Sequence, residues 1–247
     1  MELTLYGRPN PRQAEFFASA AAHTAYGGAR GGGKSWAMRR KLVLLCLGYK
    51  GLNCLLLRRT LPELRENHVI PLLKELGDAA AYNATERVFR FPNGSRLKLG
   101  YCDGANDVYQ YQGQEYDVIG MEEATHFTER QRMFLTTANR STRADFTPRM
   151  YYTANPGGVG HRWVKRLFID RDFITGRDDP EENEDPADYV FIPATVEDNE
   201  ALLRASPGYL RLLSALPEDL RRACRYGDWG ALGGSYFSEF DNDAHTC

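Results

Sequence analysis

The sequence predicts an α/β fold with a mostly parallel central sheet flanked by helices. Short apolar, β-rich segments alternate with segments of helical periodicity, which is the order that strand–helix–strand units produce. A glycine-rich segment, residues 28–35, stands between an apolar run and a helical segment. A later apolar run ends in two adjacent carboxylates, Glu122 and Glu123.

The composition is that of an ordinary globular domain. Of 247 residues, 43% are hydrophobic and 26% are charged, and this length favours one large domain, alone or with a small appendage. No apolar run approaches the ~18–20 residues of a membrane span, so no membrane role is expected. The five cysteines are scattered and indicate thiols in a reducing cytoplasm. With a net charge of -2, nucleic-acid binding would require basic residues gathered on one face or by oligomerisation.

The first part of the chain gives clear strand and helix signals. The apolar run 21–26 predicts the first strand, and residues 36–47 have the periodicity of the helix that follows. Residues 52–57 are β-rich and predict the next strand. Thr60 can cap a further helix, which has a proline and an acid in its first turn and is expected to end near Leu76.

The later part predicts more strands and a helical end. A Pro-Asn-Gly-Ser turn at residues 92–95 predicts a hairpin between the strands that flank it. Leucines at helical spacing in 200–223, interrupted by Pro207 and Pro217, predict two or three short helices. Residues 177–188 are rich in carboxylates and are expected to form a solvated loop or, alternatively, a surface that repels DNA or a partner. The remaining predicted elements are a helix at 128–138 and strands at 88–91, 96–101, 116–121, 150–154 and 189–193.

The glycine-rich segment fits G-x-x-x-x-G-K-[ST], the Walker A pattern of phosphate-binding loops. Its members are Gly28, Ala29, Arg30, Gly31, Gly32, Gly33, Lys34 and Ser35. Glycines let consecutive N–H groups converge on an oxyanion, and the following helix adds the positive end of its dipole. Lys34 is expected to reach the β- and γ-phosphates, and the Ser35 hydroxyl to bind Mg²⁺. The sequence therefore predicts binding of a nucleoside triphosphate with Mg²⁺.

The two carboxylates at the end of residues 116–121 are predicted to complete the site. At the tip of the strand beside the phosphate loop, Glu122 is expected to hold Mg²⁺ through its water shell, and Glu123 to orient and polarise the attacking water. Asn155 follows the next predicted strand. It is predicted either to sense the γ-phosphate or to belong to an ordinary Asn-Pro-Gly turn.

ATP is favoured over GTP. Residues 117–120 match the D-x-x-G pattern of GTP switches, but Asp117 would open the strand instead of closing it. The sequence also contains no guanine-reading N-K-x-D motif. The expected cofactors are therefore ATP and Mg²⁺.

In their order, these motifs resemble the ATPase part of the large terminase subunit of tailed bacteriophages, over most of the chain. Gln13, before an apolar helix, is similar to the family's adenine-recognising glutamine. Gln13 and Asn155 thus join the phosphate loop as predicted nucleotide-binding residues, and Arg30 matches the arginine of the family's loop. Other segments that resemble family motifs are 57–60, 113–117, 198–199 and 226–230.

The resemblance implies a P-loop NTPase of the ASCE, or RecA-like, type with a small helical lid. It assigns residues 1–196 to the ATPase core, 197–232 to the lid and 233–247 to the start of a linker to an absent nuclease domain. It implies ATP hydrolysis that drives double-stranded viral DNA into a procapsid in the bacterial host cytoplasm. The implied partners are DNA, the portal protein, the small terminase subunit and further copies in a ring, although the isolated domain is expected to be monomeric. Nuclease activity is expected only of the full-length protein.

Two departures from the family pattern bear on the chemistry. The first acid is usually Asp, and the extra methylene of Glu122 predicts altered Mg²⁺ affinity without its loss. Some relatives place a trans-acting arginine before the acidic strand, where residues 109–112 contain none. Because such an arginine contributes on the order of 10³-fold or more in phosphoryl transfer, Arg30 is the first replacement candidate, followed by Arg140 and Arg143. The predicted catalytic residues are Glu123, Lys34 and Arg30.

Two other functions remain open at this point. A helicase-like or recombinase ATPase shares the chemistry but would need a second core domain or a strand-exchange region. A non-hydrolysing, nucleotide-dependent interaction module is the alternative of another class, and substitution of Glu123 distinguishes it. DNA contact has no motif of its own. The basic clusters 39–41, 58–59 and 162–166 are candidates, although the first is more simply explained as the solvent-exposed face of the helix after the phosphate loop.

Overall fold

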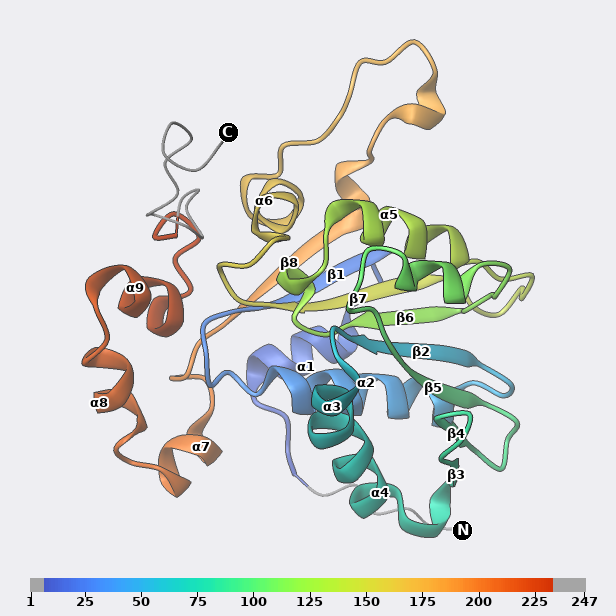
Figure 1. Cartoon of the computed structure of the whole chain (residues 1–247), viewed down its shortest axis with the longest axis horizontal. Coiled ribbons are helices and arrows are strands. Elements are labelled where there is room, and N and C mark those ends of the chain that lie inside the picture. Colours follow the sequence, from blue (N-terminus) through green and yellow to red (C-terminus); the bar gives the residue numbers. More distant parts are fainter. Residues whose placement is uncertain (1–6, 233–247) are drawn as a thin grey trace, which may run out of the picture.

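The computed structural model describes residues 7–232. Its strands are β1 (His23–Gly28), β2 (Asn53–Arg58), β3 (Ala81–Asn83), β4 (Val88–Arg90), β5 (Arg96–Tyr101), β6 (Val118–Met121), β7 (Arg149–Ala154) and β8 (Tyr189–Ala194). They form one sheet in the order β3-β4-β5-β2-β6-β7-β1-β8 (Figure 1). Along this order, the neighbouring strands β5, β2, β6, β7, β1 and β8 all pair in parallel. Only the pairs β3–β4 and β4–β5 are antiparallel. The predicted mostly parallel α/β fold is confirmed.

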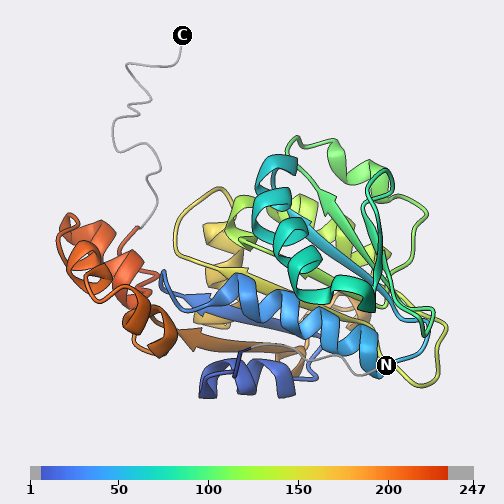
Figure 2. The same cartoon turned by 90° about the horizontal axis from the view of Figure 1, so that it is seen from below.

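Helices cover both faces of the sheet (Figures 1 and 2). One face carries α1 (Pro11–Ala18), α2 (Lys34–Gly48), α3 (Leu61–Leu64) and α4 (Ile70–Leu76). The other carries α5 (Glu129–Ala138), α6 (His161–Val164) and the π-helical turn η5 (Lys165–Asp170). Between α3 and α4 the helix continues as a second π-helical turn, η1 (Arg65–Val69). The Thr60 hydroxyl caps α3 by accepting from the amide of Glu63, as predicted.

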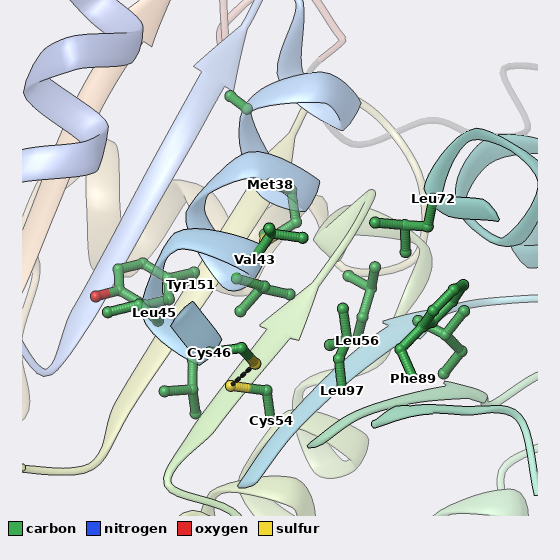
Figure 3. Packing of buried hydrophobic residues seen from close by; sticks show 14 of the residues in the cluster. Met38, Val43, Leu45, Cys46, Cys54, Leu56, Leu72, Phe89, Leu97 and Tyr151 are labelled. Carbon is green, nitrogen blue, oxygen red and sulfur yellow. Dashed lines mark hydrogen bonds between the residues drawn. The ribbon is translucent and has the colours of Figure 1, made fainter. Parts of the chain in front are cut away.

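The side chains of β2 point alternately to the two faces of the sheet and so belong to both hydrophobic cores. Cys54 and Leu56 point to the core beneath α2, while Leu55 and Leu57 point to the core beneath α5, because successive strand residues face opposite sides. Central parallel strands are buried on both faces and therefore read as continuous apolar runs. In the first core the sulfur atoms of Cys54 and Cys46 lie 3.6 Å apart (Figure 3), and burial raises the pKa of the Cys54 thiol.

The strand order corrects one expectation about the acidic strand. β6, which ends before Glu122, is not beside the phosphate-loop strand β1, since β7 lies between them and pairs with both. Strand order depends on contacts distant in the sequence, so the motifs alone could not fix it. Among the strands and α-helices, the short strand β3 and the helix formed by α6 and η5 also escaped prediction.

The C-terminal part of the described chain forms helices α7 (Glu200–Ala205), α8 (Tyr209–Ser214) and α9 (Glu218–Tyr226), as the prolines predicted. They lie at the end of the sheet where β1 and β8 finish (Figure 1). The division between core and lid at residues 196–197 stays a prediction, and the predicted linker 233–247 lies outside the described residues. None of the helices within residues 7–232 combines the length and apolarity needed to cross a membrane.

Candidate active site

The carboxyl ends of β1, β7 and β6 meet at one edge of the sheet. The phosphate loop follows β1, Asn155 follows β7, and Glu122 and Glu123 follow β6. A cavity of about 970 Å³ opens there, and its lining includes Lys34, Ser35, Glu123 and Asn155. The structure therefore brings both halves of the predicted site together, while the role of each residue stays a prediction.

The loop backbone needs glycine at specific positions. Gly31 and Gly33 have φ of +83° and +74°, in the left-handed region that disfavours residues with a Cβ. The loop is also crowded, because a Cβ at Gly33 would lie 2.6 Å from the Nε2 of Gln13, and one at Gly31 would lie 2.9 Å from the Tyr209 ring. Both constraints exclude larger residues, so the loop can take this course only with glycine at 31 and 33.

The loop amides divide into two groups. The amide of Ala29 donates to the Ala194 carbonyl at 3.0 Å, and that of Arg30 donates to the Cys224 carbonyl at 2.7 Å. Within residues 7–232, the amides of 31–33 have no protein acceptor. Buried or half-buried N–H groups without acceptors are costly, so these three are available to bind an oxyanion.

Lys34 is buried beneath the phosphate loop. Its Nζ donates to the Ala29 carbonyl at 2.6 Å. Burial lowers the pKa of Lys34, and the nearby carboxylates of Glu123 and Glu122 oppose that shift. A desolvated ammonium with one neutral acceptor gains strongly from an anionic ligand.

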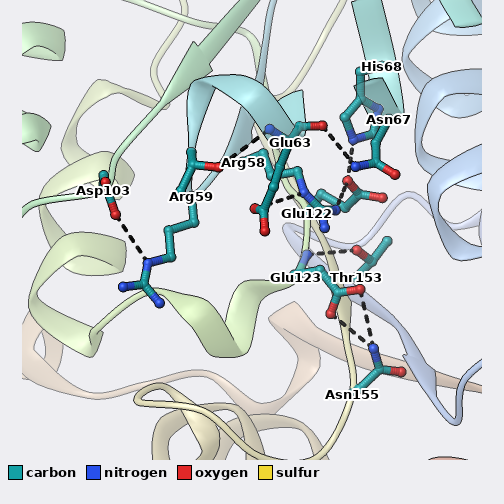
Figure 4. Close-up of polar contacts among 11 residues, drawn as sticks. Arg58, Arg59, Glu63, Asn67, His68, Asp103, Glu122, Glu123, Thr153 and Asn155 are labelled. Carbon is teal, nitrogen blue, oxygen red and sulfur yellow. Dashed lines mark hydrogen bonds and ion pairs between the residues drawn. The ribbon is translucent and has the colours of Figure 1, made fainter. Parts of the chain in front are cut away.

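Glu122 is wholly buried and held by two residues. Its Oε2 accepts from Nη1 of Arg58 at 2.5 Å and contacts Nε2 of His68 (Figure 4). Burial would raise the pKa of Glu122, but His68, Arg58 and the Ser35 hydroxyl together lower it to about 2. The Oε1 atom is buried without a hydrogen-bond partner of standard geometry. An ionised carboxylate with a free oxygen beside a serine hydroxyl fits Mg²⁺, which prefers oxygen ligands.

Glu123 is strained and contacts Asn155. Its φ is +53°, which is uncommon for a residue with a side chain and characteristic of functional sites. Its amide donates to the Thr153 hydroxyl at 3.1 Å. Nδ2 of Asn155 donates to the Glu123 carboxylate at 2.9 and 3.3 Å (Figure 4). Asn155 therefore lines the cavity but is directed at the predicted water-orienting glutamate.

Gln13 and Arg30 occupy different environments. Gln13 is buried, its Oε1 accepts from the Asn10 amide at 3.0 Å, and its Nε2 donates to the Gly33 carbonyl at 3.4 Å. This side chain thus joins the start of α1 to the phosphate loop, and its predicted contact with adenine stays a prediction. The Arg30 side chain is exposed and lines the cavity.

The next arginine candidates lie elsewhere. Arg140 pairs with Glu115 at 2.9 Å and Arg143 with Asp145 at 2.7 Å, close to the beginnings of β6 and β7 and not to their ends. They are therefore at the opposite edge of the sheet from the cavity of their own chain. Asp117 is also at that edge and accepts from the Asn53 amide at 2.8 Å, which agrees with the rejection of a GTP switch.

Sequence reasoning missed three residues of the site. Arg58 and Arg162 both line the cavity. Each stood in a basic cluster, and Arg58 also in a segment that resembles a family motif, but neither pattern assigned its residue to the nucleotide site. His68 gave no signal at all, since a single histidine within a helix is usually a structural residue.

These features define the protein class: a P-loop NTPase fold in which the phosphate loop and Glu123 line one cavity, with Glu122 buried next to Glu123 in the chain. The chain belongs to the family described as "Terminase large subunit, T4likevirus-type, N-terminal", whose model matches residues 25–242. No curated relative matches the chain in sequence.

Solved structures show the same fold at low sequence identity. The large terminase of a thermophilic bacteriophage matches with a TM-score of 0.70 and 16% identity, over 90% of this chain and 54% of that one. The large terminase ATPase domain of Thermus phage P74-26 matches with a TM-score of 0.63 and 16% identity, over 90% of this chain and 94% of that domain. The bacteriophage HK97 large terminase matches with a TM-score of 0.53 and 14% identity, over 87% and 46%. The present chain thus spans about half the length of the first of these terminases.

Proposed function

We propose that this chain is the ATPase part of a packaging motor that binds ATP and Mg²⁺, hydrolyses the ATP and thereby moves double-stranded viral DNA into a procapsid. The observation that carries the proposal is the meeting of Lys34 and Glu123 at one cavity. Family membership supports it, as do the thermophilic-phage terminase structures in complex with ADP and with ATP-γ-S.

The residues present fit a nucleotide with its metal ion. The free amides of 31–33 and the Lys34 ammonium would hold the phosphates. The Ser35 hydroxyl and the Glu122 carboxylate would hold Mg²⁺, which when bound neutralises charge on the phosphate oxygens. The low pKa of Glu122, about 2, keeps this carboxylate ionised at neutral pH, as a cation ligand requires.

Glu123 and Arg30 are assigned the remaining chemistry. The Glu123 carboxylate would orient the attacking water and accept its proton, and the amide of Asn155 would fix that carboxylate in place. The exposed guanidinium of Arg30 would balance charge that develops on the transferred phosphoryl group. Because each group has a separate task, substitutions should separate binding from turnover.

Contacts between the phosphate loop and residues 197–232 would couple ATP hydrolysis to movement of these residues. Nδ2 of Asn199 donates to the Gly31 carbonyl at 2.7 Å, and the amide of Arg30 donates to the Cys224 carbonyl at 2.7 Å. Gly227 packs so closely that a Cβ there would lie 2.7 Å from the carbonyl carbon of Gly28. We propose that residues 197–232 act as a lid on the core of 1–196, and that a ring of copies, the portal protein and the small terminase subunit are partners in the host cytoplasm.

The substitution Glu123→Gln tests the proposal. It should abolish steady-state phosphate release while ATP still binds and is trapped, because the amide cannot accept the proton from water. Glu15→Gln, at an exposed glutamate of α1, is the matched control and should release phosphate at the wild-type rate. Unchanged release in Glu123→Gln would rule out this residue. ATP binding without any release by the wild-type chain would favour the non-hydrolysing module.

A further inference from the structure

A second cavity lies at the edge of the sheet opposite the active site. It has a volume of about 870 Å³ and opens where β2, β5 and β6 begin. We call it the basic groove, because the positively charged side chains in its lining are Arg87, Arg90, Arg96, Lys98, Arg140 and Arg143. The carboxylates in the same lining are Glu86, Glu115 and Asp117, so cations outnumber them.

The sheet register places like charges against each other in this groove. Arg90 of β4 lies directly opposite Arg96 of β5, and Lys98 follows Arg96 on the same face. Like charges directly opposite each other destabilise a sheet. The pKa of Lys98 is lowered by burial and further by the charges of Arg87 and Arg96. The isolated chain thus holds an unfavourable arrangement that a bound anion would relieve.

Half of the cations in the groove have a carboxylate partner. Arg90 pairs with Glu86, Arg140 with Glu115 and Arg143 with Asp145. Three such local pairs are exposed or partly exposed and contribute little to stability. These pairs balance the charges of Arg90, Arg140 and Arg143 and, within residues 7–232, leave the charges of Arg87, Arg96 and Lys98 without a paired carboxylate.

The other three cations of the groove are Arg87, Arg96 and Lys98. Within the described part of the chain, their side chains contact only neutral groups. Nε of Arg96 donates to Oδ1 of Asn53 at 2.8 Å, and Nζ of Lys98 donates to Oε1 of Gln114 at 3.0 Å. The Arg87 guanidinium stands 5.6 Å from the centre of the Tyr101 ring, and its Nε is buried without a hydrogen bond.

Arg87 also has a strained backbone, with φ of +56°. Backbone strain of this kind persists only where the surrounding structure fixes it, and it is frequent at functional sites. Together with its buried, unpartnered Nε, it indicates a guanidinium held in position for a ligand.

We propose that the basic groove binds the phosphate backbone of double-stranded nucleic acid. Arg96, Lys98 and Arg87 would each contact phosphate oxygens, which guanidinium and ammonium groups bind with charge-assisted hydrogen bonds. This locates the DNA contact that the proposed function requires, and it rests on that function only for the identity of the polymer. It also explains how a chain of net charge -2 can attract DNA.

The competing ligand is the acidic segment 177–188 of a second copy. Four of its seven carboxylates are engaged within their own chain. Glu184 pairs with Arg166 at 2.7 Å and Glu182 with Arg177 at 2.8 Å, while Asp179 and Asp185 cap the turns that follow them. Phosphate is therefore the favoured anion, and docking of a second copy is an outcome that the experiment can detect.

The experiment measures the affinity of the 247-residue chain for a fluorescent DNA duplex, without nucleotide, across a series of salt concentrations. The double variant Arg96→Gln/Lys98→Gln keeps hydrogen-bonding side chains but removes two charges. We expect its salt slope to be less steep by about two and its affinity at ~0.1 M salt to be roughly 30- to 100-fold weaker. The charge-retaining variant Arg96→Lys/Lys98→Arg should keep the wild-type slope.

The matched control is Arg12→Gln/Arg204→Gln, which removes two charges from exposed ion pairs elsewhere on the surface. A wild-type slope in Arg96→Gln/Lys98→Gln, or an equal loss in the control, would overturn the proposal. So would a finding that this variant weakens self-association in sedimentation while DNA affinity is unchanged.

Failure of the inference and failure of the proposed function give different results. The basal ATP turnover of Arg96→Gln/Lys98→Gln, measured without DNA, should equal that of wild type, because neither residue contacts the active-site cavity. A chain that binds DNA through the groove but never hydrolyses ATP would retain the inference and reject the function. If the chain hydrolyses ATP but the salt slope of the variant is unchanged, the proposed function is retained and the inference is rejected.

Discussion

The buried carboxylate of Glu122 makes Arg58 a sensitive point of the structure. The side chain of Arg58 is 12% exposed and that of Glu122 is 0% exposed, so Arg58→Met would leave a buried carboxylate with His68 as its remaining partner. Removing one member of a buried ion pair costs about 3–5 kcal/mol. Because His68 remains, we expect the lower end, about 3 kcal/mol.

A double-mutant cycle separates the charge from the packing. In Arg58→Met/Glu122→Gln the neutral amide no longer needs a cation, so the total loss should be smaller than the sum of the two single losses by about 1–3 kcal/mol. Urea unfolding of the nucleotide-free chain at pH 7 provides these free energies. The control Arg12→Met removes an exposed cation from α1 and should change stability by less than about 0.5 kcal/mol.

The pH dependence of unfolding gives a second readout of the same pair. The pKa of Glu122 is lowered from 4.5 to about 2 in the folded protein. The ionised carboxylate therefore stabilises the folded state fully above the unfolded pKa of 4.5, and this stabilisation is lost as the pH falls from 4.5 to about 2. At 1.36 kcal/mol per pKa unit, the amount is about 3 kcal/mol. Arg58→Met should raise the pKa of Glu122 and thus lose part of this contribution already at neutral pH. A single-variant cost below about 1 kcal/mol, or strict additivity in the cycle, would refute the reasoning.

Two further substitutions probe the loop and the acidic pair. Gly33→Ala places a Cβ at φ +74° and 2.6 Å from Nε2 of Gln13, so it should destabilise the chain by about 1–2 kcal/mol and weaken ATP binding. Gly48→Ala, where nothing lies within 4 Å of the added atom, should be neutral or stabilising, and comparable unfolding midpoints for the two would contradict the account. Asn155→Ala removes the bonds at 2.9 and 3.3 Å to the Glu123 carboxylate. It should lower steady-state ATP turnover by up to about 100-fold with little change in ATP affinity, and unaltered turnover would show that Asn155 does not position Glu123.

Local sequence signals were sufficient for much of the fold. The glycines of the phosphate loop, the Pro-Asn-Gly-Ser turn and the Thr60 cap each act through neighbouring residues, and each appears where expected. The prolines at 207 and 217 likewise end helices at the predicted places. Such signals are reliable because their physical cause is contained in a few consecutive residues.

What escaped prediction depends on contacts between distant residues. The place of β7 between β1 and β6 follows from packing of the whole sheet. The contacts of Glu122 with Arg58 and His68 join residues separated by 64 and 54 positions. Neither contact leaves a spacing pattern in the sequence. The basic groove was missed for the same reason, since its arginines come from several separate segments.

The central claim is that the phosphate loop and the acidic pair act on one nucleotide, and calorimetric binding of ATP-γ-S with and without Mg²⁺ tests it most directly. In the wild-type chain Mg²⁺ should tighten binding, and Lys34→Ala should weaken binding in both conditions. Glu122→Gln, once shown to be folded, should keep the metal-free affinity but lose the gain that Mg²⁺ provides. An equal gain from Mg²⁺ in wild type and in Glu122→Gln would contradict the claim.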